Sequence, residues 1–196
     1  MPKPDYKLVS ELILNHVEVI RDLESQVSLI TKIGEQLIET LSSDRQIFLC
    51  GNGGSAADSQ HIAAELVARF KKERRGLPAI ALTTDTSTLT AIGNDYGYEK
   101  IFSRQIEALA KKDDVLVGIS TSGNSPNVVE AVRVASMRGL KTIGLTGGTG
   151  GILKTLCDVV LVVPSDVTAR IQEAHILLGH MWCEFIDAWA ADEVIN

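Results

Sequence analysis

Two histidines, a glutamate and a glutamine could form one reactive site in this sequence. His61 and Glu65 stand four residues apart in a helical stretch, so their side chains project from the same face. Gln172 and His180 stand in a later helical stretch, about 12 Å apart along its axis, and converge only if that helix runs alongside the site. Imidazole, carboxylate and amide groups suit a divalent metal such as zinc, and they equally suit acid–base catalysis without metal. Spacing alone does not separate these chemistries from a solvated polar face.

Two short segments rich in glycine and serine are candidates for binding a phosphate group. Gly51–Ser55 and Ser120–Ser125 each follow an apolar run and precede a helical stretch. Glycines let the backbone approach a ligand, and a helix N-terminus offers free N–H groups at the positive end of a dipole. Neither segment matches a P-loop or a dinucleotide-binding motif, which argues against an ATPase or a dehydrogenase. The alternative is that both segments are only tight turns and helix caps.

Two further segments are weaker candidates. Asn94 and Asp95 stand in a loop-like stretch and could bind sugar hydroxyls, or could form a plain turn. The glycines of 147–151 are accompanied by one hydroxyl, and this composition predicts mainly a flexible connection.

Several charged residues also need an interpretation. Arg69 and the run Lys71–Arg75 could add positive charge near a phosphate, but a solvated helix end explains this run better. At His16 and His175 we expect ordinary packed or exposed side chains.

The elements that position these residues follow from the hydrophobic pattern. Residues 7–42 carry apolar side chains at three- and four-residue spacing, which predicts a helical N-terminal extension over 1–44 with an apolar stripe. Apolar runs predict strands at 46–50, 79–82, 114–119, 140–146 and 158–163. Helical patterns fall at 56–70, 86–94, 103–110, 126–137 and 168–189.

This alternation is typical of a parallel sheet covered by helices on both faces. We therefore predict an α/β fold, a three-layer αβα sandwich with a five-stranded parallel sheet, in a single domain spanning 1–196. Ligands of such sheets bind beyond the carboxyl ends of the strands, where the glycine and serine segments are expected. The N-terminal extension must bury its stripe on this domain or on another subunit.

Composition narrows the class of protein. The chain has 196 residues, 45% hydrophobic and 22% charged, which suits one globular domain. Its formal net charge of −6 argues against non-specific nucleic-acid binding. The three cysteines follow no disulfide or zinc-knuckle pattern and predict buried thiols in a reducing compartment. No apolar run approaches a membrane span and no signal peptide is visible, so we expect a cytoplasmic protein that binds neither nucleic acid nor membrane.

The order of these motifs resembles that of the sugar isomerase (SIS) domain family, and within it the phosphoheptose isomerases. The residues that carry the resemblance are Gly51–Ser55, His61, Glu65, Gly93–Asp95, Ser120–Ser125, Arg170–Glu173 and His180. The serine segment alone would indicate only the broader family. Its combination with His61, Glu65, Gln172 and His180 is much more specific, and the resemblance covers nearly the whole chain.

The resemblance implies the SIS fold and an aldose–ketose isomerase that converts sedoheptulose 7-phosphate to D-glycero-D-manno-heptose 7-phosphate. This reaction is the first step of ADP- or GDP-heptose synthesis for lipopolysaccharide or related glycans. The resemblance also implies a cytoplasmic homotetramer with active sites at subunit interfaces, where the N-terminal helices would pack.

Site residues are implied in the same way. One zinc ion per subunit would be bound by His61, Glu65, Gln172 and His180. Substrate contacts would come from the following residues: Asn52, Gly53, Gly54, Ser55, Glu65, Asn94, Asp95, Ser120, Thr121, Ser122, Ser125 and Gln172.

For this activity we hypothesise an isomerisation through a cis-enediol. Glu65 and His180 form the catalytic pair, removing a proton from C1 of the ketose and delivering one to C2. Zinc would polarise the carbonyl, although a residue bound tightly to zinc is a poorer proton carrier. Some similar family members carry an acid where Ala169 stands here, so any role of that acid is dispensable or falls to Asp166.

Three alternatives remain at this point. A non-catalytic SIS scaffold that associates with the replication initiator is similar in length, but it lacks the acid and the histidine found here at Glu65 and His180. A regulatory SIS module that senses a phosphosugar usually accompanies an effector domain, for which 196 residues leave no room. The third alternative is an isomerase of another phosphosugar, because the carbon number depends on pocket depth.

Overall fold

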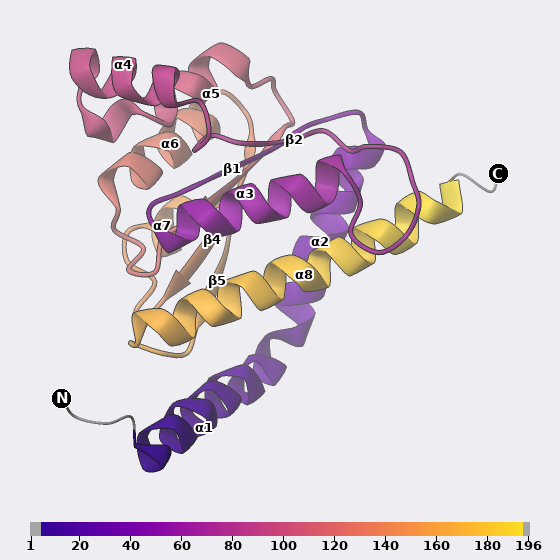
Figure 1. Cartoon of the computed structure of the whole chain (residues 1–196). Helices are drawn as coiled ribbons and strands as arrows, with labels where there is room; N and C mark the ends of the chain where they lie inside the picture. The colour runs from indigo at the N-terminus through magenta and orange to yellow at the C-terminus, as the bar shows by residue number, and fades with distance from the viewer. Residues whose placement is uncertain (1–4, 194–196) are drawn as a thin grey trace.

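A computed structural model describes residues 5–193 and shows a five-stranded parallel sheet between two layers of helices (Figure 1). The strands are β1 (Ile47–Gly51), β2 (Ala79–Ala81), β3 (Val115–Ile119), β4 (Lys141–Gly147) and β5 (Val159–Val163). Their order in the sheet is β2-β1-β3-β4-β5, and every neighbouring pair is parallel. The predicted three-layer αβα sandwich is confirmed.

The sheet is buried on both faces because its strands are apolar almost throughout. Along β1, Ile47 and Leu49 face one core, whereas Phe48 and Cys50 face the other. This alternation follows from the two-residue period of a strand, and it divides the interior into two apolar layers.

One core is covered by three helices: α2 (Val27–Ser42), α3 (Gly54–Val67) and α8 (Thr168–Glu193). The long helix α8 contacts both α2 and α3. Trp182 of α8 is buried and donates its indole N–H to the carbonyl of Ile30 in α2 at 3.0 Å. These contacts hold α8 beside α3, and both helices carry predicted site residues.

The other core is covered by four helices and a single helical turn. These elements are α4 (Thr86–Tyr96), the turn η2 (Tyr98–Lys100), α5 (Ser103–Leu109), α6 (Pro126–Met137) and α7 (Leu153–Leu156). The helix α6 begins with proline, whose missing N–H would have no partner in a first helical turn.

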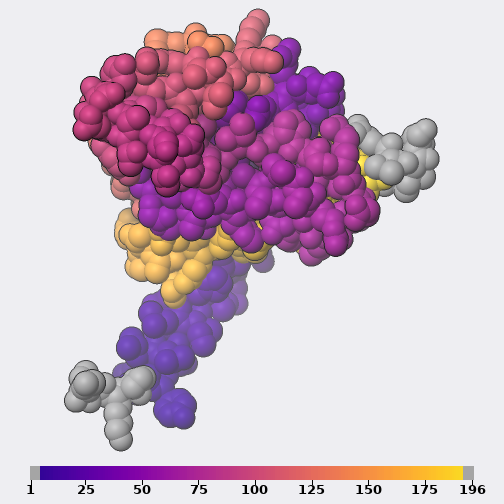
Figure 2. All heavy atoms as spheres, turned by 45° about the horizontal axis from the view of Figure 1, so that its top comes forward, coloured from indigo at the N-terminus to yellow at the C-terminus, as the bar shows by residue number. Residues whose placement is uncertain are grey.

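The N-terminal helix α1 (Tyr6–Asp22) extends away from this body, as Figures 1 and 2 show. A turn, η1 (Leu23–Gln26), joins it to α2. None of the residues of α1 is buried, and Leu8 of its apolar stripe is 53% exposed. Polar contacts link α1 to the start of α8: Arg170 donates to the carbonyl of Leu12 at 2.6 Å, and His16 bonds Glu173 at 2.7 Å. The N-terminal part of the α1 stripe is therefore exposed, and only Val19 and Ile20 at its end pack partly against the core.

The three cysteines are free thiols, of which Cys50 and Cys183 are buried. Burial, with a smaller contribution from nearby carboxylates, raises the pKa of Cys157 and of Cys183 to about 12. Within residues 5–193, no helix combines the length and apolar character that crossing a bilayer requires.

Candidate active site

The candidate site lies where the strand order changes direction. From β1 the chain moves to β2 on one side and later to β3 on the other, and Gly51 pairs in register with Ile119. The segments that follow β1 and β3 therefore leave the sheet side by side at its carboxyl edge. Ligands of open α/β sheets bind at such a point, as predicted for the glycine and serine segments.

Glycines after β1 let the start of α3 approach another helix. Gly53 has a φ of 54°, a left-handed value that glycine adopts without strain. A Cβ at Gly54 would overlap the side-chain amide of Gln172, so this glycine lets α8 lie against the first turn of α3. Ser55 is 3% exposed, which places its side chain beneath the loop.

An asparagine pair connects the glycine segment to α6. Asn52 and Asn127 each donate a side-chain N–H to the other's oxygen, both at 2.8 Å, and the hydroxyl of Tyr98 donates to Asn52 at 3.1 Å. Asn127 is 1% exposed and also accepts the N–H of Val128. The sequence analysis missed Asn127 and Tyr98. Asparagine usually occupies the N-cap position of a helix. Its occurrence two residues further on, inside the first turn of a predicted helix, is the signal that could have indicated Asn127.

Hydroxyl groups of the serine segment gather at the N-terminus of α6. The hydroxyls of Ser120 and Ser125 lie 2.9 Å apart, and the backbone N–H of Asn124 donates to the Ser122 hydroxyl at 3.2 Å. A hollow of about 310 Å³ opens beside them. It is lined by Thr121, Ser122, Asn124, Gly147, Gly148, Thr149, Asp166, Thr168 and Ile171. Hydroxyls and a helix N-terminus around such a hollow suit a phosphate group.

The glycine segment 147–151 packs against the serine segment, so a flexible connection is the wrong description. The N–H of Gly147 donates to the carbonyl of Thr121 at 2.9 Å, and Leu153 donates to Gly123 at 3.1 Å. A Cβ at Gly123 or Gly151 would overlap the backbone of the opposite segment. These glycines let two loops share one wall of the hollow.

His61, Glu65 and His180 meet between α3 and α8. The Nε2 atoms of His61 and His180 are 2.8 Å apart, and His61 Nε2 lies 3.5 Å from Glu65 Oε1. A Cβ at Gly179 would lie 2.6 Å from the side chain of Ile62, so this glycine allows the close approach of the two helices. The His61 and Glu65 side chains are 46% and 23% exposed, which leaves them accessible to a ligand.

The donor chemistry of this cluster suits zinc. Two imidazoles and a carboxylate are ordinary zinc ligands, but the two Nε2 atoms at 2.8 Å are closer than the roughly 3.3 Å of two nitrogens on one tetrahedral zinc. Within residues 5–193, no group of three His, Cys, Asp or Glu side chains is arranged to hold a metal ion. The amide of Gln172 lies against Gly54, toward the start of α3. Zinc binding would therefore require these side chains to move.

Comparison with known proteins shows the family of this chain. A family model of the SIS domain matches residues 13–147, and the phosphoheptose isomerase of Aliarcobacter butzleri (strain RM4018) is 57% identical over 180 residues. That match covers 92% of this chain and 95% of the relative. The chain belongs to the phosphoheptose isomerases of the SIS domain family.

Two solved phosphoheptose isomerases share the fold across their length. The GmhA structure from Neisseria gonorrhoeae is 47% identical, with a TM-score of 0.88 over 93% of this chain and 98% of that one. The structure from Francisella tularensis is 37% identical, with a TM-score of 0.91 over 95% and 100%. The family resemblance in the sequence is thus confirmed.

The structure also shows where Asn94, Asp95 and His175 of this phosphoheptose isomerase family member lie. Asn94 and Asp95 lie inside α4, so a loop-like stretch was the wrong prediction, since the helix continues to Tyr96. Both are exposed, and Asn94 donates to Asp95 at 2.7 Å. His175 is buried against the carbonyl of Thr146, and burial lowers its pKa to about 4, as expected for a packed histidine.

The structure also corrects the prediction for the basic run Lys71–Arg75. We expected a solvated helix end, but Arg74 is buried against Asp187 of α8. Periodicity could not show this because the run follows the end of α3, where no helical pattern sets its orientation.

Proposed function

We propose that this chain is an aldose–ketose isomerase that converts sedoheptulose 7-phosphate to D-glycero-D-manno-heptose 7-phosphate in heptose biosynthesis. The proposal is supported by 57% identity to a named phosphoheptose isomerase over 92% of the chain. The structural observation that carries it is the meeting of His61, Glu65 and His180 on two helices whose first turns reach the phosphate-binding loops.

In this proposal the hollow at the N-terminus of α6 anchors the phosphate. The hydroxyls of Thr121, Ser122 and Thr168 line the hollow and would donate to the phosphate oxygens without a lysine, whereas the carboxylate of Asp166 in the same lining opposes the charge. Asn52, held by Asn127, lies between this anchor and α3 and is placed to bind sugar hydroxyls. Anchoring the phosphate fixes the position of the distant reacting carbons.

Glu65 and His180 are proposed to move the protons. One of them takes a proton from C1 of the open-chain ketose while O2 gains one, which gives a cis-enediol. The proton on O1 then leaves as C2 gains a proton, and the aldose forms with no external oxidant or reductant. Without a bound metal ion, His61 would hold the His180 ring through the 2.8 Å contact between their Nε2 atoms, one of which would then carry a hydrogen.

We further propose that one zinc ion per subunit binds at this cluster, through His61, Glu65, Gln172 and His180. A bound zinc ion would polarise the substrate carbonyl and stabilise the negative charge of the enediolate. The donor set supports this proposal. Metal analysis of the purified protein, before and after mutation of His61 to alanine, tests it independently of turnover.

A cytoplasmic homotetramer with active sites at subunit interfaces is also proposed. Its support is the apolar side of α1, where Leu8, Leu12 and Ile13 are between 46% and 59% exposed in the single chain. Light scattering should give a mass near four chains for the wild type and a smaller mass for the L8K/L12K variant. A monomeric wild type would contradict the assembly.

The activity is tested by incubating the purified protein with sedoheptulose 7-phosphate and following aldose formation. Parallel incubations with a ketohexose phosphate and a ketopentose phosphate test the third alternative, a different substrate. Loss of turnover after chelation, with recovery on adding zinc, would support the metal proposal, whereas turnover after complete metal removal would leave catalysis to Glu65 and His180 alone.

A further inference from the structure

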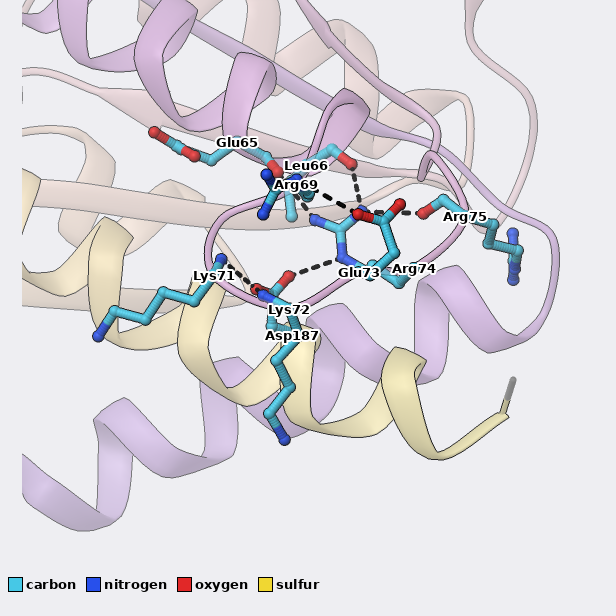
Figure 3. Close-up of polar contacts among 9 residues, drawn as sticks. All are labelled: Glu65, Leu66, Arg69, Lys71, Lys72, Glu73, Arg74, Arg75 and Asp187. Atoms are coloured by element: carbon cyan, nitrogen blue, oxygen red, sulfur yellow. Dashed lines mark hydrogen bonds and ion pairs between the residues drawn. The ribbon is translucent and has the colours of Figure 1, made fainter. Parts of the chain in front are cut away.

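A buried ion pair fastens the loop after α3 to the C-terminal half of α8 (Figure 3). Arg74 donates Nε–H to Asp187 Oδ1 at 2.6 Å, and the two side chains are 0% and 2% exposed. A buried ion pair contributes little net stability compared with well-packed apolar residues of the same volume. Its presence beside the candidate site therefore calls for an explanation other than stability.

The remaining N–H groups of Arg74 close the end of the helix that carries Glu65. Nη2 donates to the carbonyl of Glu65 at 2.8 Å, and Nη1 donates to the carbonyls of Leu66 and Arg75, both at 2.9 Å (Figure 3). The last carbonyls of a helix lack partners within the helix, and a cation is favourable there. The planar guanidinium thus fixes the backbone at Glu65 relative to α8.

Asp187 holds the other part of the loop. Its Oδ2 accepts the backbone N–H of Lys71 at 2.6 Å and of Lys72 at 2.9 Å. Burial alone would raise the pKa of Asp187, but these two N–H groups and the Arg74 guanidinium outweigh burial and hold the pKa below its usual value. The carboxylate therefore stays charged and keeps all three donors.

The loop carries an aromatic ring to the second catalytic residue. Phe70, directly before Lys71, stacks on His180 with ring centroids 5.4 Å apart and planes 21° from parallel. The ammonium of Lys71 lies 5.1 Å above the same phenyl ring and pairs with Glu184 of α8. Holding the N–H of Lys71 therefore also holds the ring that faces His180.

We propose that Arg74 and Asp187 are positioning residues for the isomerisation, setting Glu65 through its backbone carbonyl and His180 through the ring of Phe70. This inference rests on the proposed function. It assigns the ion pair no contact with substrate. Its effect should therefore fall on the rate of proton transfer, with little effect on binding of the sugar phosphate.

The first test is the double variant R74M/D187L, which removes both charges and keeps apolar volume in their place. We expect a folded protein with a lowered midpoint of urea unfolding, because backbone groups of Glu65, Leu66 and Lys71 lose their partners. In the folded variant kcat should be lowered about 10- to 100-fold and KM changed less than about threefold. R74K should also lower kcat, since one ammonium cannot reproduce the fork that spans several acceptors. The control K141M breaks the exposed pair of Lys141, at the start of β4, with Glu39 of α2, and should leave kcat unchanged.

A second test leaves the ion pair intact and keeps the inference testable if the double variant fails to fold. F70A should lower kcat about tenfold, and F70Y, which retains the ring, should restore it. Loss of ring stacking should also shift the His180 ring proton resonances in NMR spectra of F70A and R74M/D187L, a readout that does not require turnover.

The outcomes separate this inference from the proposed function. A wild type without turnover contradicts the proposed function. In that case the His180 ring proton resonances alone test whether Arg74 and Asp187 position His180. Wild-type kcat in a folded R74M/D187L or in F70A, or unchanged His180 resonances in both variants, would overturn the inference.

Discussion

Replacing Asn127 by aspartate tests whether the asparagine pair stands beside a bound phosphate. In N127D the new carboxylate still accepts N–H groups from Asn52 and Val128, but it loses the N–H that Asn127 donates to Asn52 Oδ1. The hydroxyl of Tyr98 still donates to that oxygen at 3.1 Å. The main change is thus one negative charge in the first turn of α6.

The magnitude follows from this position. Asn127 stands two residues after Ser125, so a phosphate held at the N-terminus of α6 lies on the order of 8 Å from its side chain. Two unit charges at that distance repel by about 2 kcal/mol at an effective dielectric constant of 20, which corresponds to about 30-fold in affinity. Screening by salt reduces this value, so we expect KM to rise at least about tenfold, with kcat changed less than threefold.

The assay is steady-state turnover of sedoheptulose 7-phosphate, with thermal unfolding of each variant as a check on folding. The matched control S136D adds the same charge to an exposed site on α6, about 14 Å further along the helix, and should leave KM within twofold. A folded N127D with the KM of the wild type would refute the placement of phosphate at this helix.

Three further predictions concern other parts of the chain. G54A should place a methyl group where the flexible Gln172 amide lies. We therefore expect kcat/KM to fall about tenfold and the unfolding free energy to change by less than about 1 kcal/mol. Unchanged kcat/KM would contradict the proposed role of Gln172. The thiols of Cys157 and Cys183, with pKa values raised to about 12 mainly by burial, should react with a thiol reagent at pH 8 far more slowly than in urea-unfolded protein. Because burial lowers the pKa of His175 from 6.5 to about 4, the unfolded chain binds more protons in that window, and stability should fall by up to about 3 kcal/mol as the pH drops through it. H175Q should show a smaller fall in denaturant titrations, and an equal fall would contradict a neutral buried His175.

The sequence predicts the strands closely because each is a short apolar run bounded by polar or glycine residues. Every strand begins and ends within one residue of its predicted bounds. The helix over 126–137 is also predicted fully, since Pro126 marks its start. The order of the strands could not be predicted, because it depends on which side of β1 each crossover passes.

The site is predictable only in part, for physical reasons. The pairing of His61 with Glu65 follows from helical spacing, but their meeting with His180 depends on α3 and α8 lying side by side. The burial of Arg74 could not be predicted, because its partner Asp187 is 113 residues away and its neighbours in sequence are exposed. Contacts between distant segments are thus what the sequence pattern leaves open.

The central claim is that proton transfer at Glu65 performs the isomerisation. The most direct measurement compares the wild type with E65Q, following turnover of sedoheptulose 7-phosphate and its binding by calorimetry. The account predicts aldose formation by the wild type, turnover lowered at least about 1000-fold in E65Q, and sugar-phosphate binding by both proteins. Turnover by E65Q near that of the wild type would contradict the assignment of Glu65, and absence of aldose in a folded, substrate-binding wild type would contradict the activity itself.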